Sequence, residues 1–179
     1  MSTQPTSALP PVGDGDHVVG ADSPQLTLVE YGDFGCPHCF QAMRPVRSLI
    51  ERFEGLRLVW RHLPDPELHP GADLAAELSE LAATRGRFWD AHGLLLAGRE
   101  TFSREGLLSV AEQLDMDPEE AAVALDERTF RDRITAMADG GHRAGARGTP
   151  TFFVGAERME GPWRRLAEVV PERLQGANR

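Results

Sequence analysis

The 179-residue chain contains two cysteines, Cys36 and Cys39, which are separated only by a proline and a histidine. A run of β-favouring residues, 26–31, comes shortly before them, and Pro37 suits the first turn of a helix. The sequence therefore predicts a strand that leads into a helix whose first turn carries both cysteines. Residues three apart on a helix place their Cα atoms about 5–6 Å from each other, within the range that a disulfide accepts.

This position predicts different roles for the two thiols. Unpaired N–H groups and the positive end of the helix dipole stabilise a thiolate at the start of a helix, so the pKa of Cys36 should be lowered. We expect Cys36 to be exposed and to attack a disulfide. Cys39, one turn further in and shielded, would then resolve the mixed disulfide. His38 can donate a hydrogen bond to the sulfur or add positive charge near it.

A purely structural role for the pair is less favoured. Closing a four-residue loop with a disulfide contributes only about 2 kcal/mol. Zinc also suits this spacing, but a structural zinc site needs two further ligands and no second cysteine pair exists. The remaining histidines are scattered singly: His17, His62, His69, His92 and His142. We therefore expect no metal, and no cofactor beyond the Cys36–Cys39 couple itself.

Composition and charge disfavour several other classes of function. The formal net charge of −9 argues against a nucleic-acid-binding surface, and the absence of lysine excludes Schiff-base chemistry. No apolar run approaches the ~20 residues that span a bilayer, and the first residues lack the pattern of a signal peptide. We expect a cytoplasmic protein with neither a nucleic-acid nor a membrane partner. Export is the alternative if the natural N-terminus differs.

The rest of the chain has the pattern of an interrupted α/β domain. Residues 56–63 are a second predicted strand, so that strand, helix and strand form a right-handed βαβ unit. After a proline-rich break at 64–70, about 80 residues have helical patterns, far more than a crossover of about a dozen residues needs. Strand character returns at 151–154, residues 157–160 can pair with it, and a helix over 163–174 closes the chain.

We divide the chain accordingly into four segments. Residues 1–16 are a predicted disordered tail, and residues 17–66 are the first part of the α/β domain. Residues 67–147 are a helical insert, and residues 148–179 complete the domain. Within the insert, helices are expected around 74–81, 88–95 and 107–114, from Asp117 onward, and around 130–137, the last weakened by Gly140 and Gly141.

The strand, the Cys36-Pro37-His38-Cys39 motif, the helical insert and Gly148-Thr149-Pro150-Thr151, in this order, resemble the DsbA-like branch of the thioredoxin superfamily. The resemblance covers His17 to Leu174. It implies a thioredoxin fold with a helical insert between the βαβ unit and a cis-proline strand, with Pro150 facing the disulfide. It also implies a dithiol–disulfide oxidoreductase that acts on protein or peptide thiols and is served by a small-thiol or protein redox partner. The backbone of Thr149 would pair with an extended substrate, and Thr149 Oγ1 would approach the Cys36 sulfur.

Glu30 lies six residues before Cys36, where the resemblance implies a buried acid beneath the second cysteine. A carboxyl group within an apolar strand should have a raised pKa, which makes Glu30 a candidate proton acceptor for Cys39. The alternative is an edge strand with Glu30 in solvent. Relatives often pair this acid with a lysine, and we expect Arg61 or His62 to substitute for it here. Asp33 is either a solvated loop acid or part of the site.

Two other functions remain open. A redox-responsive binding module would use the state of the Cys36–Cys39 pair only to control docking of a partner, without turnover. A glutathione-dependent isomerase or transferase is also compatible with a DsbA-like fold. Such enzymes generally carry serine at the first cysteine position, so Cys36 argues against this interpretation.

Overall fold

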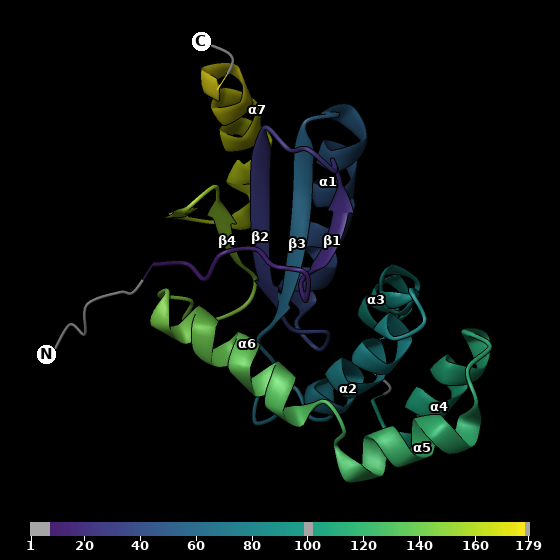
Figure 1. The fold of residues 1–179 in the computed structure, drawn as a ribbon. Helices are drawn as coiled ribbons and strands as arrows, with labels where there is room; N and C mark the ends of the chain where they lie inside the picture. The colour runs from purple at the N-terminus through teal and green to yellow at the C-terminus, as the bar shows by residue number, and fades with distance from the viewer. Residues whose placement is uncertain (1–7, 99–101, 178–179) are drawn as a thin grey trace, which may run out of the picture.

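The computed structural model describes residues 8–98 and 102–177. Its centre is a five-stranded sheet in the order β1-β3-β2-β4-β5 (Figure 1). The strands are β1 His17–Gly20, β2 Leu26–Gly32, β3 Leu56–His62, β4 Thr151–Val154 and β5 Glu157–Arg158. β2 and β3 are parallel, whereas β1 and β4 pair antiparallel to β3 and β2. β2 is therefore an internal strand, with a neighbour on each side.

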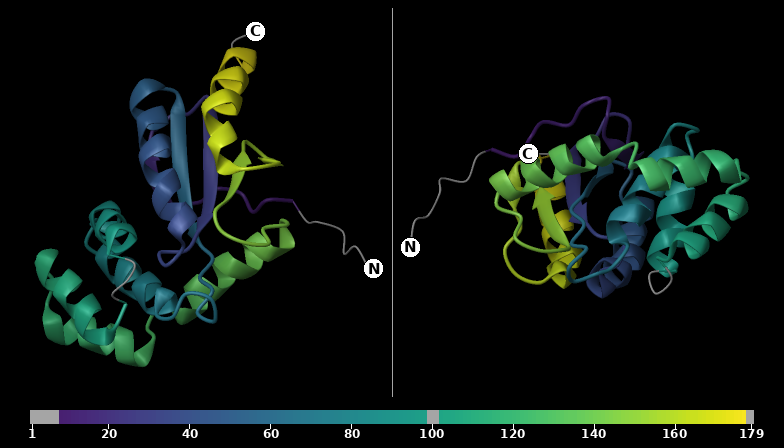
Figure 2. Two further views of the ribbon diagram at one scale, coloured as in Figure 1. Left: turned by 180° about the vertical axis from the view of Figure 1, so that it is seen from behind. Right: turned by 90° about the horizontal axis from the view of Figure 1, so that it is seen from below.

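Helices surround this sheet in two groups (Figures 1 and 2). α1 (Pro37–Arg52) and α7 (Leu166–Ala177, preceded by the 3-10 turn Trp163–Arg165) cover one face of the sheet. The insert gathers at the end of the sheet where β2 and β3 finish. Its helices are α2 Ala72–Ala83, α3 Phe88–Ala97, α4 Arg104–Gln113, α5 Pro118–Glu127 and α6 Arg131–Arg143. This arrangement confirms the predicted α/β class with a helical insert.

Buried side chains connect the insert to the start of α1. One apolar cluster combines Cys36, Cys39 and Trp60 with residues of the insert such as Leu78 and Leu95. A second cluster lies between the sheet, α1 and α7. Because the first cluster includes both cysteines, the insert forms part of the wall around them.

α6 runs through Gly140 and Gly141, which were expected to weaken it. A Cβ atom at position 141 would lie 2.6 Å from Cε1 of the buried Tyr31. The missing side chain therefore allows α6 to lie directly on the tyrosine ring of β2. Contact between the helix and this ring offsets the low helix propensity of glycine, and the helix continues to Arg143.

The predicted disordered tail needs correction. Residues 1–7 lie outside the described residues, but residues 8–16 pack against the sheet. Arg61 Nη1 donates a hydrogen bond to the carbonyl oxygen of Pro10 at 2.9 Å, and its Nε donates to Asp16 Oδ1 at 2.8 Å. A buried guanidinium requires acceptors, and this segment supplies them. Strand β1, which follows directly, was not predicted as a strand. Residues 99–101 of the predicted insert and 178–179 of the predicted last segment also lie outside the described residues.

Candidate active site

The two cysteines lie at the N-terminus of α1, as reduced thiols. Cys36 is the N-cap residue and Cys39 belongs to the first helical turn. Only 4% of Cys36 is exposed, and none of Cys39. The expectation that Cys36 is exposed was therefore wrong, since the loop before β4 covers its sulfur. The Cys36 thiol donates a hydrogen bond to the carbonyl oxygen of Thr149 at 3.2 Å.

The surroundings separate the acidities of the two thiols. A hydrogen bond from the Cys39 thiol is the largest influence on Cys36. Together with hydrogen bonds from the side chain of Thr149 and from the backbone N–H groups of Cys39 and His38, it outweighs burial and lowers the pKa of Cys36 to about 5. Burial, followed by the hydrogen bond to Cys36 and the charge of Glu30, raises the pKa of Cys39 well above its ordinary value. At neutral pH the pair therefore holds one thiolate and one thiol.

Glu30 lies on β2 and is 3% exposed. Burial is the main cause that raises its pKa to about 8, and the charge of Cys36 adds to the effect. The edge-strand alternative is excluded, because β3 and β4 flank β2. The charge of Glu30 contributes to the raised pKa of Cys39, which places this carboxyl group close to the second cysteine.

The expected cationic partners of Glu30 are engaged elsewhere. Arg61 binds Asp16 and donates to Tyr31 Oη, on the opposite face of the sheet. His62 donates to Glu80 Oε1 at 3.1 Å. The prediction that one of the two replaces the missing lysine was therefore wrong: Arg61 follows Trp60 along β3 and so faces away from the helix side, and His62 lies beyond it among the insert residues.

A cavity of about 380 Å³ lies beside Glu30, between α1, α3 and β1. Glu30 Oε1 and His92 Nε2 both line it, and neither atom has a hydrogen-bond partner among the described residues. Burial, followed by the charges of His62 and His17, lowers the pKa of His92 to about 3. The outer wall of the cavity includes the exposed residues Arg47 and Glu51, so it connects the surface with the buried carboxyl group.

A separate groove of about 670 Å³ gives access to Cys36. Thr149 and the exposed residues Pro37 and His38 line it together with the segment that follows β3. The Thr149–Pro150 peptide bond is cis. The groove contains Cys36, whereas the cavity contains Glu30, and the two share no lining residue among the described ones.

Comparison with known proteins places this geometry in a family. A family model described as thioredoxin matches residues 13–169 of the chain. The chain belongs to the thioredoxin family. Its fold matches that of BdbD from Bacillus subtilis with a TM-score of 0.79 and 24% identity over 90% of this chain and 94% of that one. A thioredoxin-like oxidoreductase from Silicibacter pomeroyi matches with a TM-score of 0.79 and 25% identity over 91% and 94% of the two chains. The DsbA-like fold suggested by the sequence is confirmed.

Curated relatives include longer proteins. The chain is 43% identical over 150 residues to a protein of Salinispora tropica named Na(+)/H(+) antiporter NhaA 3, and 44% identical over 150 residues to NhaA 1 of Salinispora arenicola. These matches cover 84% of this chain but only 23% of each relative. Within the described residues, none of the helices has the length and apolar character that crossing a membrane requires.

Of the two alternatives left open for Asp33, a solvated loop acid is excluded, because the residue is 1% exposed. Its carboxylate accepts hydrogen bonds from the backbone N–H of Gly35 at 2.7 Å and of Asp65 at 3.0 Å. His69 Nδ1 donates to Asp33 Oδ2 at 2.8 Å. Asp33 therefore joins the loop before Cys36 to the proline-rich segment after β3. Sequence reasoning missed His69, and only its place beside the prolines could have drawn attention to it.

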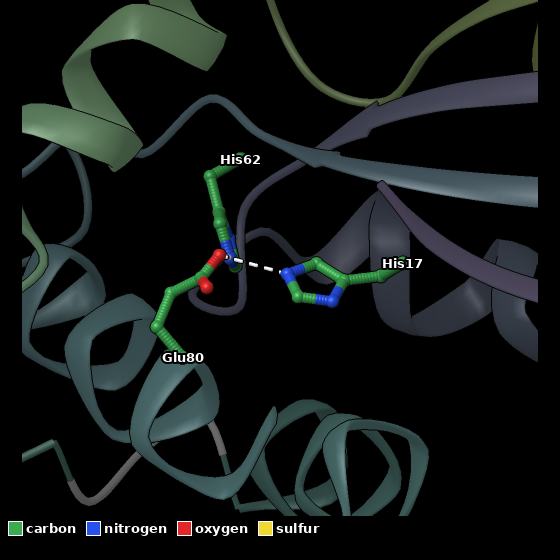
Figure 3. A group of neighbouring side chains, drawn as sticks. All are labelled: His17, His62 and Glu80. Atoms are coloured by element: carbon green, nitrogen blue, oxygen red, sulfur yellow. Dashed lines mark hydrogen bonds and ion pairs between the residues drawn. The ribbon is translucent and has the colours of Figure 1, made fainter. Parts of the chain in front are cut away.

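His17 and His62, which are scattered singly in the sequence, meet the buried side chain of Glu80, a residue that the sequence did not single out (Figure 3). His17 Nε2 donates to Glu80 Oε1 at 2.7 Å, the same oxygen that accepts from His62. Arg133 Nε donates to the other oxygen, Glu80 Oε2, at 2.6 Å. Burial alone would raise the pKa of Glu80, but the hydrogen bonds from His17 and His62 lower it well below its ordinary value.

This cluster could in principle hold a metal ion. However, Trp60 Nε1 donates to His62 Nδ1 at 3.2 Å, so the proton of neutral His62 is on Nε2, which donates it to Glu80. A nitrogen that carries a proton cannot bind a metal. Hydrogen bonds thus account for the cluster, and it ties β1 and β3 to α2 and α6.

Proposed function

We propose that the chain is a protein dithiol–disulfide oxidoreductase that exchanges disulfides with protein or peptide thiols through Cys36 and Cys39. The observation that carries the proposal is the separation of the two thiol acidities within one helical turn. A thiolate that opens onto a groove is a nucleophile, and a buried thiol beside a carboxyl group is a resolving residue. The protein would need no cofactor beyond this couple, and a small thiol or a protein partner would restore its starting state.

In the reducing direction, the Cys36 thiolate attacks one sulfur of a substrate disulfide. The Cys36–substrate S–S bond forms, the substrate S–S bond breaks, and its electron pair leaves on the second substrate sulfur. Glu30 then accepts the Cys39 proton, and Cys39 attacks Cys36 and releases the first substrate sulfur. The substrate gains two electrons, and the Cys36–Cys39 disulfide holds the oxidised state. The same steps in reverse oxidise a substrate dithiol.

The electrostatic coupling between Cys36 and Glu30 favours proton transfer from Cys39 only after the mixed disulfide has formed. The Cys36 thiolate raises the pKa of Glu30. Formation of the mixed disulfide removes this charge, so the pKa of Glu30 falls at the stage when it must act as a base. The cavity beside Glu30 offers the proton a way to solvent that does not pass through the groove occupied by substrate.

Two variants test this proposal. Cys39→Ser should trap mixed disulfides with protein substrates, because Cys36 attacks and no second thiol resolves the product. Cys36→Ser should trap none. Reduction of insulin in the presence of dithiothreitol should show multiple turnovers with the natural chain. Trapping without turnover would instead support a redox-responsive binding module.

The stabilised thiolate also predicts the redox poise of the couple. Stabilising the Cys36 thiolate favours the dithiol over the disulfide, so we expect a reduction potential above the thioredoxin value of about −270 mV. Cytoplasmic location stays a prediction; among reduced thiols such a couple would act as a reductase or isomerase. Equilibration with glutathione buffers, followed by alkylation, measures the potential. A value at or below that of thioredoxin would contradict this expectation.

A further inference from the structure

We propose that His69 is a catalytic residue of this site, with Nε2 carrying the proton of the substrate sulfur that leaves or enters at Cys36. The inference deepens the proposed function and rests on it. Its basis is the hydrogen-bonded pair of the buried Asp33 and the partly exposed His69, which lines the groove containing Cys36. In the proposed mechanism Glu30 accepts the proton of Cys39, but no residue exchanges a proton with the substrate sulfur.

His69 lies directly against the loop that carries the nucleophile. A Cβ atom built on Gly35, the residue before Cys36, would be 2.5 Å from the Cβ of His69 and 3.0 Å from its Cγ. Glycine at this position therefore allows the imidazole to approach the backbone beside the reactive sulfur. His69 and Cys36 line the same groove of about 670 Å³.

Asp33 determines which ring nitrogen faces the groove. The Asp33 side chain is fully buried and its Oδ2 accepts the hydrogen bond from His69 Nδ1 at 2.8 Å. A carboxylate that is held by backbone N–H groups keeps Nδ1 protonated and the ring in one orientation. Nε2 is then the nitrogen that takes up and releases a proton. The His69 side chain is 16% exposed, so the ring is partly accessible while its Asp33 contact is shielded.

The charges around the groove come from several elements. Asp65 and Glu67 belong to the same segment as His69, His38 comes from α1, His142 from α6, and Arg147 from the loop before β4. Within the described residues, the structure shows the His69 ring bonded to the carboxylate of Asp33 and not to that of Asp65 or Glu67. None of these groups offers the same combination of a buried carboxylate partner and a ring packed beside Cys36.

The proton transfer accompanies the first exchange step. When the Cys36 thiolate attacks a substrate disulfide, the Cys36–substrate bond forms and the substrate S–S bond breaks. The departing sulfur takes the electron pair from that bond and the proton from His69 Nε2, and it leaves as a thiol. In the opposite direction Nε2 accepts the proton of an entering substrate thiol. His69 thereby acts on the substrate sulfur, whereas Cys39, Thr149 and backbone N–H groups stabilise Cys36.

The dependence on the leaving thiol separates this role from a structural one. An alkyl thiol, with a pKa of about 8.5, leaves poorly as a thiolate, so proton donation should accelerate its departure. An aryl disulfide releases a thiolate that is stable at neutral pH and needs no proton. His69→Asn retains a donor for Asp33 but has no Nε2. We expect its kcat for a cystine-containing peptide to fall on the order of a hundredfold, with little change for an aryl disulfide.

Three further measurements complete the test. The pH profile of Cys36 alkylation should be the same in His69→Asn and the natural chain, because His69 does not act through Cys36. With the peptide substrate, the limb of the pH–kcat profile that depends on His69 in the natural chain should be absent from His69→Asn. If His69→Asn fails to fold, His69→Ala assayed with added imidazole replaces it, and imidazole should accelerate the reaction of the peptide substrate alone.

Each contrary outcome has a distinct meaning. Equal losses with both substrates, or a shifted alkylation profile, would show that His69 only supports the loop. Unchanged peptide kinetics, or no rescue by imidazole, would also overturn the assignment. Absence of turnover by the natural chain would instead contradict the proposed function, and Cys36→Ser should be inactive on both substrates in either case.

Discussion

At the scale of single residues, the structure makes two chemically identical side chains different. Cys36 and Cys39 are three positions apart, yet the pKa of one is lowered to about 5 and that of the other is raised. Hydrogen-bond donors converge on Cys36, whereas Cys39 is enclosed and lies near a carboxyl group. The difference follows from the hydrogen bonds and the burial that the folded chain gives to each thiol.

Alkylation should reveal this difference directly. Iodoacetamide should modify Cys36 with a midpoint near pH 5, because the thiolate is the reactive form, while Cys39 should react slowly throughout. Mass spectrometry of peptides from protein labelled across a pH series measures both rates. Equal labelling of the two thiols would contradict their assigned roles.

Glu30→Gln should slow resolution while stabilising the fold. Without a carboxylate to accept the Cys39 proton, mixed disulfides should persist on the order of a hundredfold longer. The pKa of Glu30 is raised in the folded chain, so the folded state binds more protons between about pH 4.5 and 8, and stability falls as pH rises through this range. Removing this group should raise the free energy of unfolding at pH 7 by about 1–3 kcal/mol.

The control for this variant is Glu54→Gln, at an exposed position just after α1. Quenched reactions separated on non-reducing gels follow the mixed disulfide, and urea titration follows stability. A Glu30→Gln chain that resolves at the normal rate would exclude Glu30 as the proton acceptor.

At the scale of elements, close backbone contacts decide how the insert meets the sheet. α6 rests on Tyr31 of β2 at Gly141, and the loop before α1 is joined to the segment after β3 through Asp33. Both contacts connect segments that are far apart along the chain. His142, which follows Gly141, and the segment after β3 both line the groove that contains Cys36, so these contacts help to position the groove wall.

Two helical glycines give a matched test of this contact. Gly141→Ala adds a methyl group 2.6 Å from the Tyr31 ring and should destabilise the fold by about 1–3 kcal/mol. Gly93→Ala in α3 meets no atom within 4 Å and should stabilise it by up to about 1 kcal/mol through helix propensity. Thermal unfolding compares the two. A stabilising Gly141→Ala would show that α6 does not depend on this close approach.

At the scale of the whole molecule, the buried side chains of His92 and Glu30, which line one cavity, make opposite contributions to the pH dependence of stability. The pKa of His92 is lowered to about 3 and that of Glu30 is raised to about 8. Between about pH 4.5 and 6.5, unfolding of the chain lets His92 take up a proton and lets Glu30 release one. The two contributions to the pH dependence of stability therefore have opposite signs and largely cancel in this range.

His92→Phe should remove one of these two contributions and so change the pH dependence of stability. Unfolded histidine binds a proton below pH 6.5 and the folded chain does not, so His92 lowers stability progressively as the pH falls. Relative to the natural chain, the free energy of unfolding of the variant should rise by about 1.4 kcal/mol for each pH unit below 6.5. Urea titrations at pH 7.5, 6.0 and 5.0 measure the difference. A constant offset between the two chains across this range would show that His92 titrates normally in the folded state.

The sequence by itself determined the elements that carry the chemistry and the family to which they point. The apolar run 26–31, the motif from Cys36 to Cys39 and the return of strand character at 151–154 are local patterns, and local patterns specify where strands and helices form. Glu30 was also identified, because the family resemblance implies an acid six residues before Cys36 and because a charged residue stands out within an apolar strand.

The tertiary structure alone decided how distant residues are used. Arg61 is occupied by Asp16, His62 by Glu80, and His69 by Asp33, and these partners are separated by 45, 18 and 36 residues. No periodicity records such pairings, because they arise from the way in which the insert and the N-terminal segment fold back onto the sheet. The burial of Cys36 has the same origin: the loop before β4 reaches it from 113 residues away, and its hydrogen bond depends on the packed chain.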